Sequence, residues 1–234
     1  TYDVISGTVN GANGLWVVQD GKVALTYDGF VEDSESWWYC KDGEVQSGKN
    51  DVIGGTVDGE WGWWVVRDGK AALSYEGFAK NGNGWWYCKD GKAQFGTYDV
   101  ISGTVNGASG LWVVQDGKVA LTYNGFIENG ESWWYCQGGK VQSGKNDVIG
   151  ATVDGEWGWW HVQNGKVNFD SNTVASNSNG WWVIRDGKVN FDYEGFAENH
   201  NGWWYCKGGK VQFGRDDVIS GCLLYTSPSP RDST

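Results

Sequence analysis

Four pairs of aromatic residues carry the clearest chemistry in this sequence of 234 residues. The two members of each pair are separated by one position, at Trp37 and Tyr39, Trp85 and Tyr87, Trp133 and Tyr135, and Trp203 and Tyr205. In a β-strand, residues two apart point to the same side, so each pair would place two rings on one face. A flat Trp or Tyr ring offers apolar area to the C–H face of a pyranose, and neighbouring Gln, Asn, Asp and Lys side chains can hydrogen-bond its hydroxyls. These eight residues are therefore predicted to bind a glycan. The alternative is that the rings only pack against the next repeat.

Residues suited to catalysis are scarce. The two histidines, His161 and His200, occupy different places in the repeats, and neither recurs with a partner. Asp58 and Glu60 could form an acid/base pair, but they lie in an Asp-Gly-Glu-Trp segment that is typical of a turn. We predict no catalytic residue and no enzymatic activity.

Four cysteines, unlike the histidines, share one place in the repeats. Each lies two residues after an invariant Trp, at Cys40, Cys88, Cys136 and Cys206. There is no Cys-x-x-Cys, and a zinc site would need four distant repeats to converge. Small buried thiols are predicted, with a disulfide between successive coils as the alternative. Asp/Asn-Gly segments lack the spacing of a calcium loop, so no metal and no cofactor is expected.

The elements that would position these residues repeat along the chain. A Trp-Trp or Leu-Trp dipeptide, followed by a Gly turn, occurs nine times at intervals of 22 or 26 residues. The dipeptides begin at Leu15, Trp37, Trp63, Trp85, Leu111, Trp133, Trp159, Trp181 and Trp203. A unit this short cannot bury a core alone and must stack on its neighbours. The predicted fold is all-β, a repeat solenoid of about nine β-hairpins.

The register of one hairpin can be worked out from its turn. Asp90-Gly91 between two apolar stretches predicts a two-residue type I′ turn. Cys88 would then lie opposite Ala93, and Trp86 opposite Phe95, on an apolar face expected to be core. The other face carries Trp85 and Tyr87 and is expected to be partly wet. In the other repeats the same register predicts Leu73 and Phe191 as core residues, and the second Trp of every dipeptide more buried than the first residue.

The chain is organised as two copies of a 96-residue block, the second modified and extended. Residues 1–47 recur almost unchanged at 97–143, and tandem Trp-rich repeats are expected over 1–221. Residues 222–234 have an unrelated composition and resemble an in-frame translation of a transposon-type sequencing adapter. We interpret them as a non-native or disordered tail. The sequence is accordingly interpreted as a fragment that originates from environmental DNA.

The charge and hydropathy of the chain exclude some classes of binding partner. The formal net charge is −11, which argues against a nucleic acid or an anionic membrane surface as the main partner. No run approaches the roughly 18 apolar residues of a membrane span, so membrane insertion is not expected.

The repeats resemble the cell-wall-binding repeats of Gram-positive surface proteins, of the choline-binding and glucan-binding type. The residues that carry the likeness run from Tyr75-Glu-Gly-Phe78 to Trp85-Trp-Tyr-Cys-Lys-Asp-Gly-Lys92, with their copies. The resemblance implies a hairpin solenoid that holds choline or glucan between aromatic residues of neighbouring hairpins. The family's Gly-Trp is Gly-Phe here and the chain has no Met, which favours a sugar platform.

These observations lead to one predicted function and one alternative. The function is multivalent, non-catalytic binding of cell-wall polysaccharide or another glycan by a secreted or cell-surface protein, with avidity along the array supplying affinity. The alternative is a structural spacer or adhesin stalk without a ligand of its own.

Overall fold

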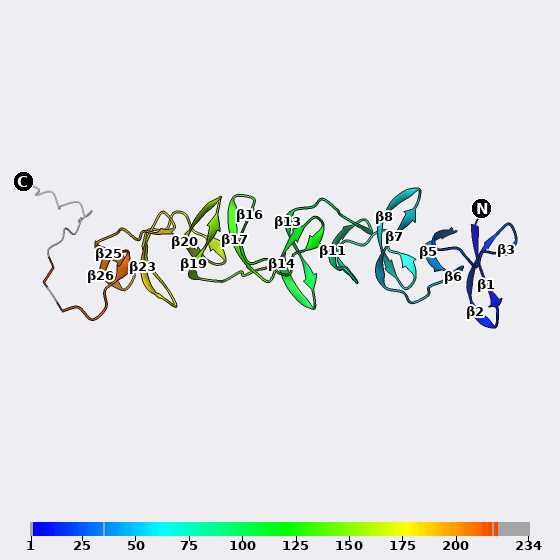
Figure 1. Cartoon of the computed structure of the whole chain (residues 1–234), viewed down its shortest axis with the longest axis horizontal. Coiled ribbons are helices and arrows are strands. Elements are labelled where there is room, and N and C mark those ends of the chain that lie inside the picture. The colour runs from blue at the N-terminus through cyan, green and yellow to red at the C-terminus, as the bar shows by residue number, and fades with distance from the viewer. Residues whose placement is uncertain (1, 35, 217, 220–234) are drawn as a thin grey trace, which may run out of the picture. The chain divides into compact units, whose positions relative to one another are not determined.

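The computed structural model describes residues 2–34, 36–216 and 218–219, and this part of the chain is all-β (Figure 1). It holds 27 strands, three for each of the nine repeats. By its internal contacts the chain divides into two compact units, 1–123 with 138–140, and 124–137 with 141–234. Each unit is a stack of repeated hairpins, so the predicted fold class is confirmed. No helix among the described residues is long and apolar enough to cross a membrane. The predicted tail at 222–234 lies outside the described residues.

Every repeat contains an opening strand, a central strand with the Trp dipeptide, and a two-residue third strand. The opening strands are β1 (Tyr2–Val9), β4 (Gly29–Asp33), β7 (Asp51–Val57), β10 (Gly77–Asn81), β13 (Asp99–Val105), β16 (Gly125–Asn129), β19 (Asp147–Val153), β22 (Thr173–Asn177) and β25 (Gly195–Asn199). The central strands are β2 (Ala12–Gln19), β5 (Ser36–Lys41), β8 (Glu60–Arg67), β11 (Gly84–Lys89), β14 (Ala108–Gln115), β17 (Ser132–Gln137), β20 (Glu156–Gln163), β23 (Gly180–Arg185) and β26 (Gly202–Lys207). The third strands are β3 (Lys22–Val23), β6 (Glu44–Val45), β9 (Lys70–Ala71), β12 (Lys92–Ala93), β15 (Lys118–Val119), β18 (Lys140–Val141), β21 (Lys166–Val167), β24 (Lys188–Val189) and β27 (Lys210–Val211).

The fourth repeat shows how the turn sequence sets the geometry. Asp90 and Gly91 have φ values of 49° and 71°, so both central residues of the turn are left-handed, as a type I′ turn requires. The turn pairs Cys88 with Ala93, which confirms the predicted register. The longer hairpin of the repeat lies upstream, where β10 pairs with β11 from Gly77↔Cys88 to Asn81↔Gly84.

The predicted pairing does not continue past Ala93. The Cα partner of Trp86 across this edge is Lys118 of the next repeat, and Phe95 lies outside the strand. Phe95 is 48% exposed, and Leu73 and Phe191 are 44% and 45% exposed, so the prediction of core positions was wrong for all three. The physical reason is the next turn: Gly117 approaches the backbone of Gln94 and Phe95 so closely that the strand cannot extend there.

Turn glycines join successive repeats. The amide of Gly91 donates a hydrogen bond to the carbonyl of Tyr75 at 2.9 Å, and its own carbonyl accepts one from the amide of Val65 at 2.7 Å. A Cβ on Gly91 would lie 2.5 Å from the carbonyl oxygen of Ala72. The turn is therefore seated on the backbone of the preceding repeat, in a space that only glycine fits.

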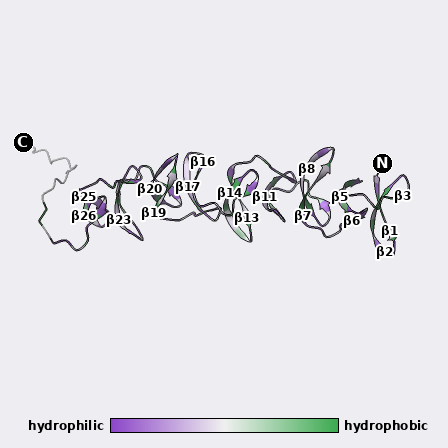
Figure 2. Cartoon of the chain, in the orientation of Figure 1, coloured by the Kyte–Doolittle hydropathy of each residue, from purple (hydrophilic) through white to green (hydrophobic). Residues whose placement is uncertain are grey.

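The core is a series of small clusters, each shared by neighbouring repeats. In one of them Val52 and Val65 of the third repeat pack with Ala79, Trp86 and Cys88 of the fourth. Hydrophobic and hydrophilic residues both occur within single hairpins (Figure 2). The residue after the second Trp lies on the other side of the central strand. Where it is a Val it has no exposed surface, so both sides of the strand can be buried, as at Val17, Val65, Val113 and Val183. This face is still partly wet, as expected, because the first residue of the dipeptide is half-buried in these repeats, as at Trp63, and Tyr87 is half-buried where a Tyr replaces the Val.

The second Trp of each dipeptide is generally the more buried residue, as predicted. Five of the nine are buried, namely Trp16, Trp64, Trp86, Trp112 and Trp160, while the residue before each is half-buried. In the last repeat Trp203 is exposed and Trp204 half-buried. In the remaining three repeats both members are half-buried.

The four cysteines are buried free thiols, each 0% exposed, and no disulfide joins them. The predicted packing role is confirmed and the disulfide alternative is not realised. Burial raises the pKa of the Cys40, Cys88 and Cys136 thiols to about 12. They therefore stay protonated at neutral pH, which makes them poor nucleophiles and poor metal ligands.

Candidate ligand-binding grooves

A groove between the second and third repeats is lined by five aromatic residues, one of which is Tyr27. It has a volume of about 520 Å³. Trp37 and Tyr39 reach it from β5, Phe30 from β4, and Trp61 from β8. We call it the Tyr39 groove.

Local packing holds the walls of the Tyr39 groove. Trp37 and Tyr39 pack against a cluster formed by Phe30 with Val57, Trp64 and Val66 of the next repeat. The rings of Phe30 and Tyr39 lie 5.6 Å apart between centroids. Gly55 allows this packing, because a Cβ there would lie 2.7 Å from the Phe30 ring. The predicted rings thus pack on the next hairpin and remain half-exposed to the groove.

Trp61 also lines the Tyr39 groove, and the sequence analysis did not predict it as a binding residue. It lies opposite Thr56 in the β7–β8 hairpin and is 65% exposed. The Asp-Gly-Glu-Trp segment was interpreted only as a turn. A usable signal was present, since Trp61 and Trp157 are the two tryptophans outside the nine dipeptides. Trp61 adds an exposed ring to the Trp37 and Tyr39 rings that line the same groove. Contiguous exposed apolar groups of this kind mark binding sites.

The polar lining of the Tyr39 groove is electrically balanced. Asp28 and Lys41 both line it. The Asp28 carboxylate accepts a hydrogen bond from the amide of Asp42 at 2.7 Å, which fixes it beside the turn. Tyr27 donates its hydroxyl to the carbonyl of Phe30 at 2.7 Å, and burial raises the pKa of this phenol, so it stays neutral and keeps the bond.

The second block repeats the arrangement. Trp133 and Tyr135 pack against Phe126, Val153 and Trp160, as Trp37 and Tyr39 do in the first block. Phe126 and Tyr135 lie 5.6 Å apart between ring centroids, and Trp157 is 64% exposed. The positions of Asp28 and Lys41 are taken by Asn124 and Gln137, which replace one opposite-charge pair by two neutral amides.

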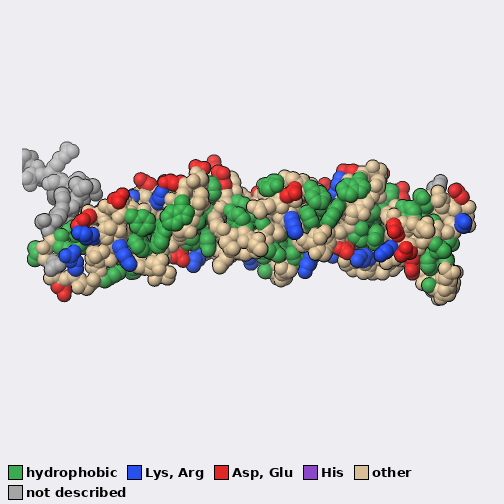
Figure 3. Space-filling view, in the orientation of Figure 1, with side chains coloured by type: hydrophobic (Ala, Val, Ile, Leu, Met, Phe, Trp, Pro, Cys, Tyr) green, Lys and Arg blue, Asp and Glu red, His purple; other side chains and the backbone are tan. Residues whose placement is uncertain are grey.

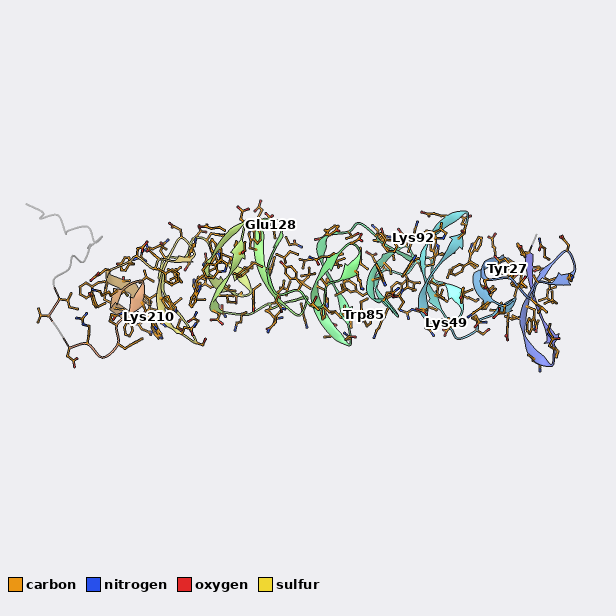
Figure 4. The ribbon with its side chains drawn as sticks, viewed as in Figure 1. Tyr27, Lys49, Trp85, Lys92, Glu128 and Lys210 are labelled. Atoms are coloured by element: carbon orange, nitrogen blue, oxygen red, sulfur yellow. The ribbon has the colours of Figure 1, made fainter. Side chains whose placement is uncertain are left out.

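The third predicted pair has a different neighbour. Trp85 and Tyr87 pack beside Phe78, Val105 and Trp112, and the Trp85 indole donates a hydrogen bond to the Asn106 side chain at 3.0 Å. Ser109 stands where the first groove has Trp61. Trp85 (Figure 4) lines a groove with Lys118 and Leu121 instead.

The fourth predicted pair lies in the last repeat. Trp203 is 50% exposed and lines a groove with Tyr205 and Phe213. The guanidinium carbon of Arg215 lies 5.4 Å from the centroid of the Tyr205 ring. A cation already occupies one face of this ring, which distinguishes it from Tyr39.

Lysines cover the second Trp of most repeats. Each ammonium lies 4.4–5.8 Å from a ring centroid, in the pairs Lys70–Trp38, Lys92–Trp64, Lys118–Trp86, Lys140–Trp112, Lys166–Trp134, Lys188–Trp160 and Lys210–Trp182. Lys92 and Lys210 are labelled in Figure 4. These are cation–π contacts between adjacent strands of successive repeats. They stabilise the stack and leave the first Trp and the Tyr as the rings available to a ligand.

His161 has a structural partner. Its Nδ1 lies 2.6 Å from the Ser171 hydroxyl, and both residues are buried. The first block has Val65 and Tyr75 at these positions, so the larger imidazole fills space left by the smaller serine. Burial lowers the pKa of His161. Among the described residues, no group of three or more His, Cys, Asp or Glu side chains could hold a metal ion.

We expect acid to destabilise the chain through His161. Its folded pKa is below the unfolded value of about 6.5, so the unfolded state binds more protons as pH falls through that value. The urea midpoint should therefore fall between pH 7.5 and pH 5. The control is the double variant His161→Val with Ser171→Tyr, which restores the pair found in the first block and should show a smaller fall. Equal falls in both proteins would contradict this assignment.

Comparisons with known proteins match this architecture. The sequence model of the choline-binding repeat matches residues 26–46, 74–94, 122–142, 170–190 and 192–212, which are the five repeats with the shorter opening strands. No curated protein matches the chain. One similar solved structure is choline binding protein F from Streptococcus pneumoniae, with 14% identity, a TM-score of 0.35, and coverage of 90% of this chain and 79% of that one. Another is the modular autolysin LytC of the same organism, with 15% identity, a TM-score of 0.25, and coverage of 81% and 49%. Both TM-scores are too low for these two structures to say more about this chain.

Proposed function

We propose that this chain binds the cell wall, and that the Tyr39 groove and the corresponding rings at Tyr135 hold the quaternary ammonium group of choline. Five segments that match the choline-binding repeat support this proposal. Two of the matched segments, 26–46 and 122–142, supply Trp37 with Tyr39 and Trp133 with Tyr135. The third ring comes from the following repeat, as Trp61 or Trp157.

The observation that carries the proposal is the set of open aromatic rings from two successive hairpins around one groove. Aromatic faces attract a desolvated cation, and cages of such rings are the usual recognition mode for quaternary ammonium groups. The net charge of −11 on the chain favours a cationic ligand over an anionic one. Glycan stacking on the same rings is the second candidate, supported by the polar side chains of Asp28 and Lys41 at the groove.

The proposed role is binding without catalysis, in a secreted or cell-surface protein. Two similar grooves in one chain would bind a repetitive wall polymer more tightly than either alone, because the second binding event is intramolecular. Trp85 with Tyr87 and Trp203 with Tyr205 remain predicted ligand residues. We expect weaker sites there, because Ser109 replaces the third ring at the former and Arg215 already covers Tyr205 at the latter.

Retention on a resin that carries immobilised choline tests the proposal. The wild-type chain should be retained and should elute with free choline. The double variant Tyr39→Ala with Tyr135→Ala should elute at a choline concentration at least tenfold lower than the wild-type chain requires. Tyr87→Ala is the matched comparison, since it removes the same residue beside Ser109, and its effect should be smaller. A wild-type chain that is not retained on choline or on cell walls would leave the structural spacer as the better interpretation.

A further inference from the structure

A second groove lies beside Trp61, between the third and fourth repeats. It has a volume of about 530 Å³ and is lined by Glu60, Trp61, Lys89, Asp90, Lys92, Gln94 and Phe95, with Gly62, Trp64 and Ala93 beneath them. We call it the Phe95 groove. Trp61 is shared with the Tyr39 groove, whereas Phe95 lines only the second one. Hydrophobic side chains reach the surface among acidic and basic ones on the face shown in Figure 3.

Phe95 is exposed and yet firmly held. Its ring packs against Trp63 at 5.7 Å and Trp86 at 5.2 Å between centroids, which leaves 48% of the residue exposed. A ring fixed in this way loses little side-chain freedom when a ligand covers it, so the entropic cost of binding is small. Together with Trp61, it gives the groove two aromatic surfaces.

The polar groups of the Phe95 groove are also ordered. The Lys92 ammonium bonds to the Glu60 carboxylate, and the Lys92 stem crosses Gly62, where a Cβ would collide with it. The Gln94 amide donates to the carbonyl of Lys92 at 2.8 Å. Glu60 and Asp90 are balanced by Lys89 and Lys92, so the groove offers hydrogen-bond donors and acceptors with no net charge.

The features of this groove recur in the second block. Glu60, Trp61 and Phe95 have identical counterparts in the second block, at Glu156, Trp157 and Phe191, and Lys188 bonds to Glu156 there. The corresponding residues are Ala12, Asn13 and Ser47 at one place in the first block and Ala108, Ser109 and Ser143 at its copy, whereas Phe213 recurs where Ser178 and Asn179 replace the Glu and the Trp. Between the two blocks, Val65, Tyr75 and Ala93 did change, to His161, Ser171 and Val189. Packing accounts for the Phe, because Phe95, Phe191 and Phe213 each contact the Trp that begins the preceding dipeptide.

We infer that the Phe95 groove and its copy at Phe191 are carbohydrate sites that each take a neutral hexopyranose of a wall glycan. Two aromatic surfaces contact the apolar faces of the sugar, and Glu60, Lys92 and Gln94 bond its hydroxyls. This inference rests on the proposed function only in taking its ligand from the cell wall. It assigns the sugar and the quaternary ammonium group to separate grooves that share Trp61.

Calorimetric titration with two sugars tests the inference, using the β-1,4-linked tetramers of N-acetylglucosamine and of glucose. The full chain should bind at least one of them saturably. The double variant Phe95→Leu with Phe191→Leu should lower that affinity at least fivefold and leave choline affinity unchanged. Leucine occupies the same position in other repeats, at Leu25, Leu73 and Leu121, so the variant should keep its thermal transition.

The outcomes separate the two proposals. No binding of either tetramer, or an unchanged affinity in the folded Leu variant, would overturn the carbohydrate site while choline binding stands. Loss of choline and sugar affinity together in the folded Leu variant would overturn the separation into two grooves. Sugar binding by a chain that does not bind choline would support the Phe95 groove and refute the proposed function.

Discussion

Gly91→Ala is expected to destabilise the chain far more than Gly21→Ala, although both glycines occupy the same place in a type I′ turn. Their φ values are 71° and 75°. A Cβ in the left-handed region costs roughly 1–2 kcal/mol, and both variants incur this cost. At Gly91 the added methyl also meets the carbonyl oxygen of Ala72 at 2.5 Å, and overpacking of this kind costs roughly 1–3 kcal/mol more.

Gly21 is the matched control for this effect, because a Cβ there meets no atom within 4 Å. Urea denaturation followed by tryptophan fluorescence should give a clearly lower midpoint for Gly91→Ala than for Gly21→Ala. Equal midpoints would mean that the turns are not seated on the preceding repeat.

Trp61→Ala with Trp157→Ala should lower choline affinity at least tenfold, which corresponds to about 1.4 kcal/mol per site. The rings are 65% and 64% exposed, so their removal takes little from the core and should leave the thermal transition nearly unchanged. The measurement is calorimetric titration with choline chloride. A fall in affinity that accompanies unfolding, or no fall at all, would argue against these rings as groove walls.

Ser109→Trp provides the opposite test of the same idea. It places the missing ring beside Tyr87, at the position that Trp61 holds beside Tyr39. We expect an additional choline site of similar affinity. A folded variant with no additional site would show that Trp61 acts through something other than the completed set of rings.

Local chemistry explains what could be predicted from the sequence. Asp-Gly and its relatives specify type I′ turns through the backbone alone, so the turn and the Cys88–Ala93 pair were predictable. The invariance of the second Trp indicated its burial for a similar reason, since every repeat packs that side in the same way. Trp37 and Tyr39 were identified because strand alternation places them on one face.

The contacts between repeats could not be predicted in this way. The third strand ends at Ala93 because the turn at Gly117 takes the space beyond it, and no residue of the fourth repeat itself signals this. Phe95 was therefore placed in the core when it forms a groove wall. Trp61 was missed because its partners in the groove come from the preceding repeat, and its own neighbours indicate only a turn.

Counting the choline sites by calorimetric titration tests the central claim most directly. The two corresponding sets of rings, around Tyr39 and around Tyr135, should give two tight choline sites in the wild-type chain. Trp61→Ala should keep one of them, and Trp61→Ala with Trp157→Ala should keep neither. A number of tight sites that stays the same in all three proteins would contradict the assignment of choline binding to these grooves.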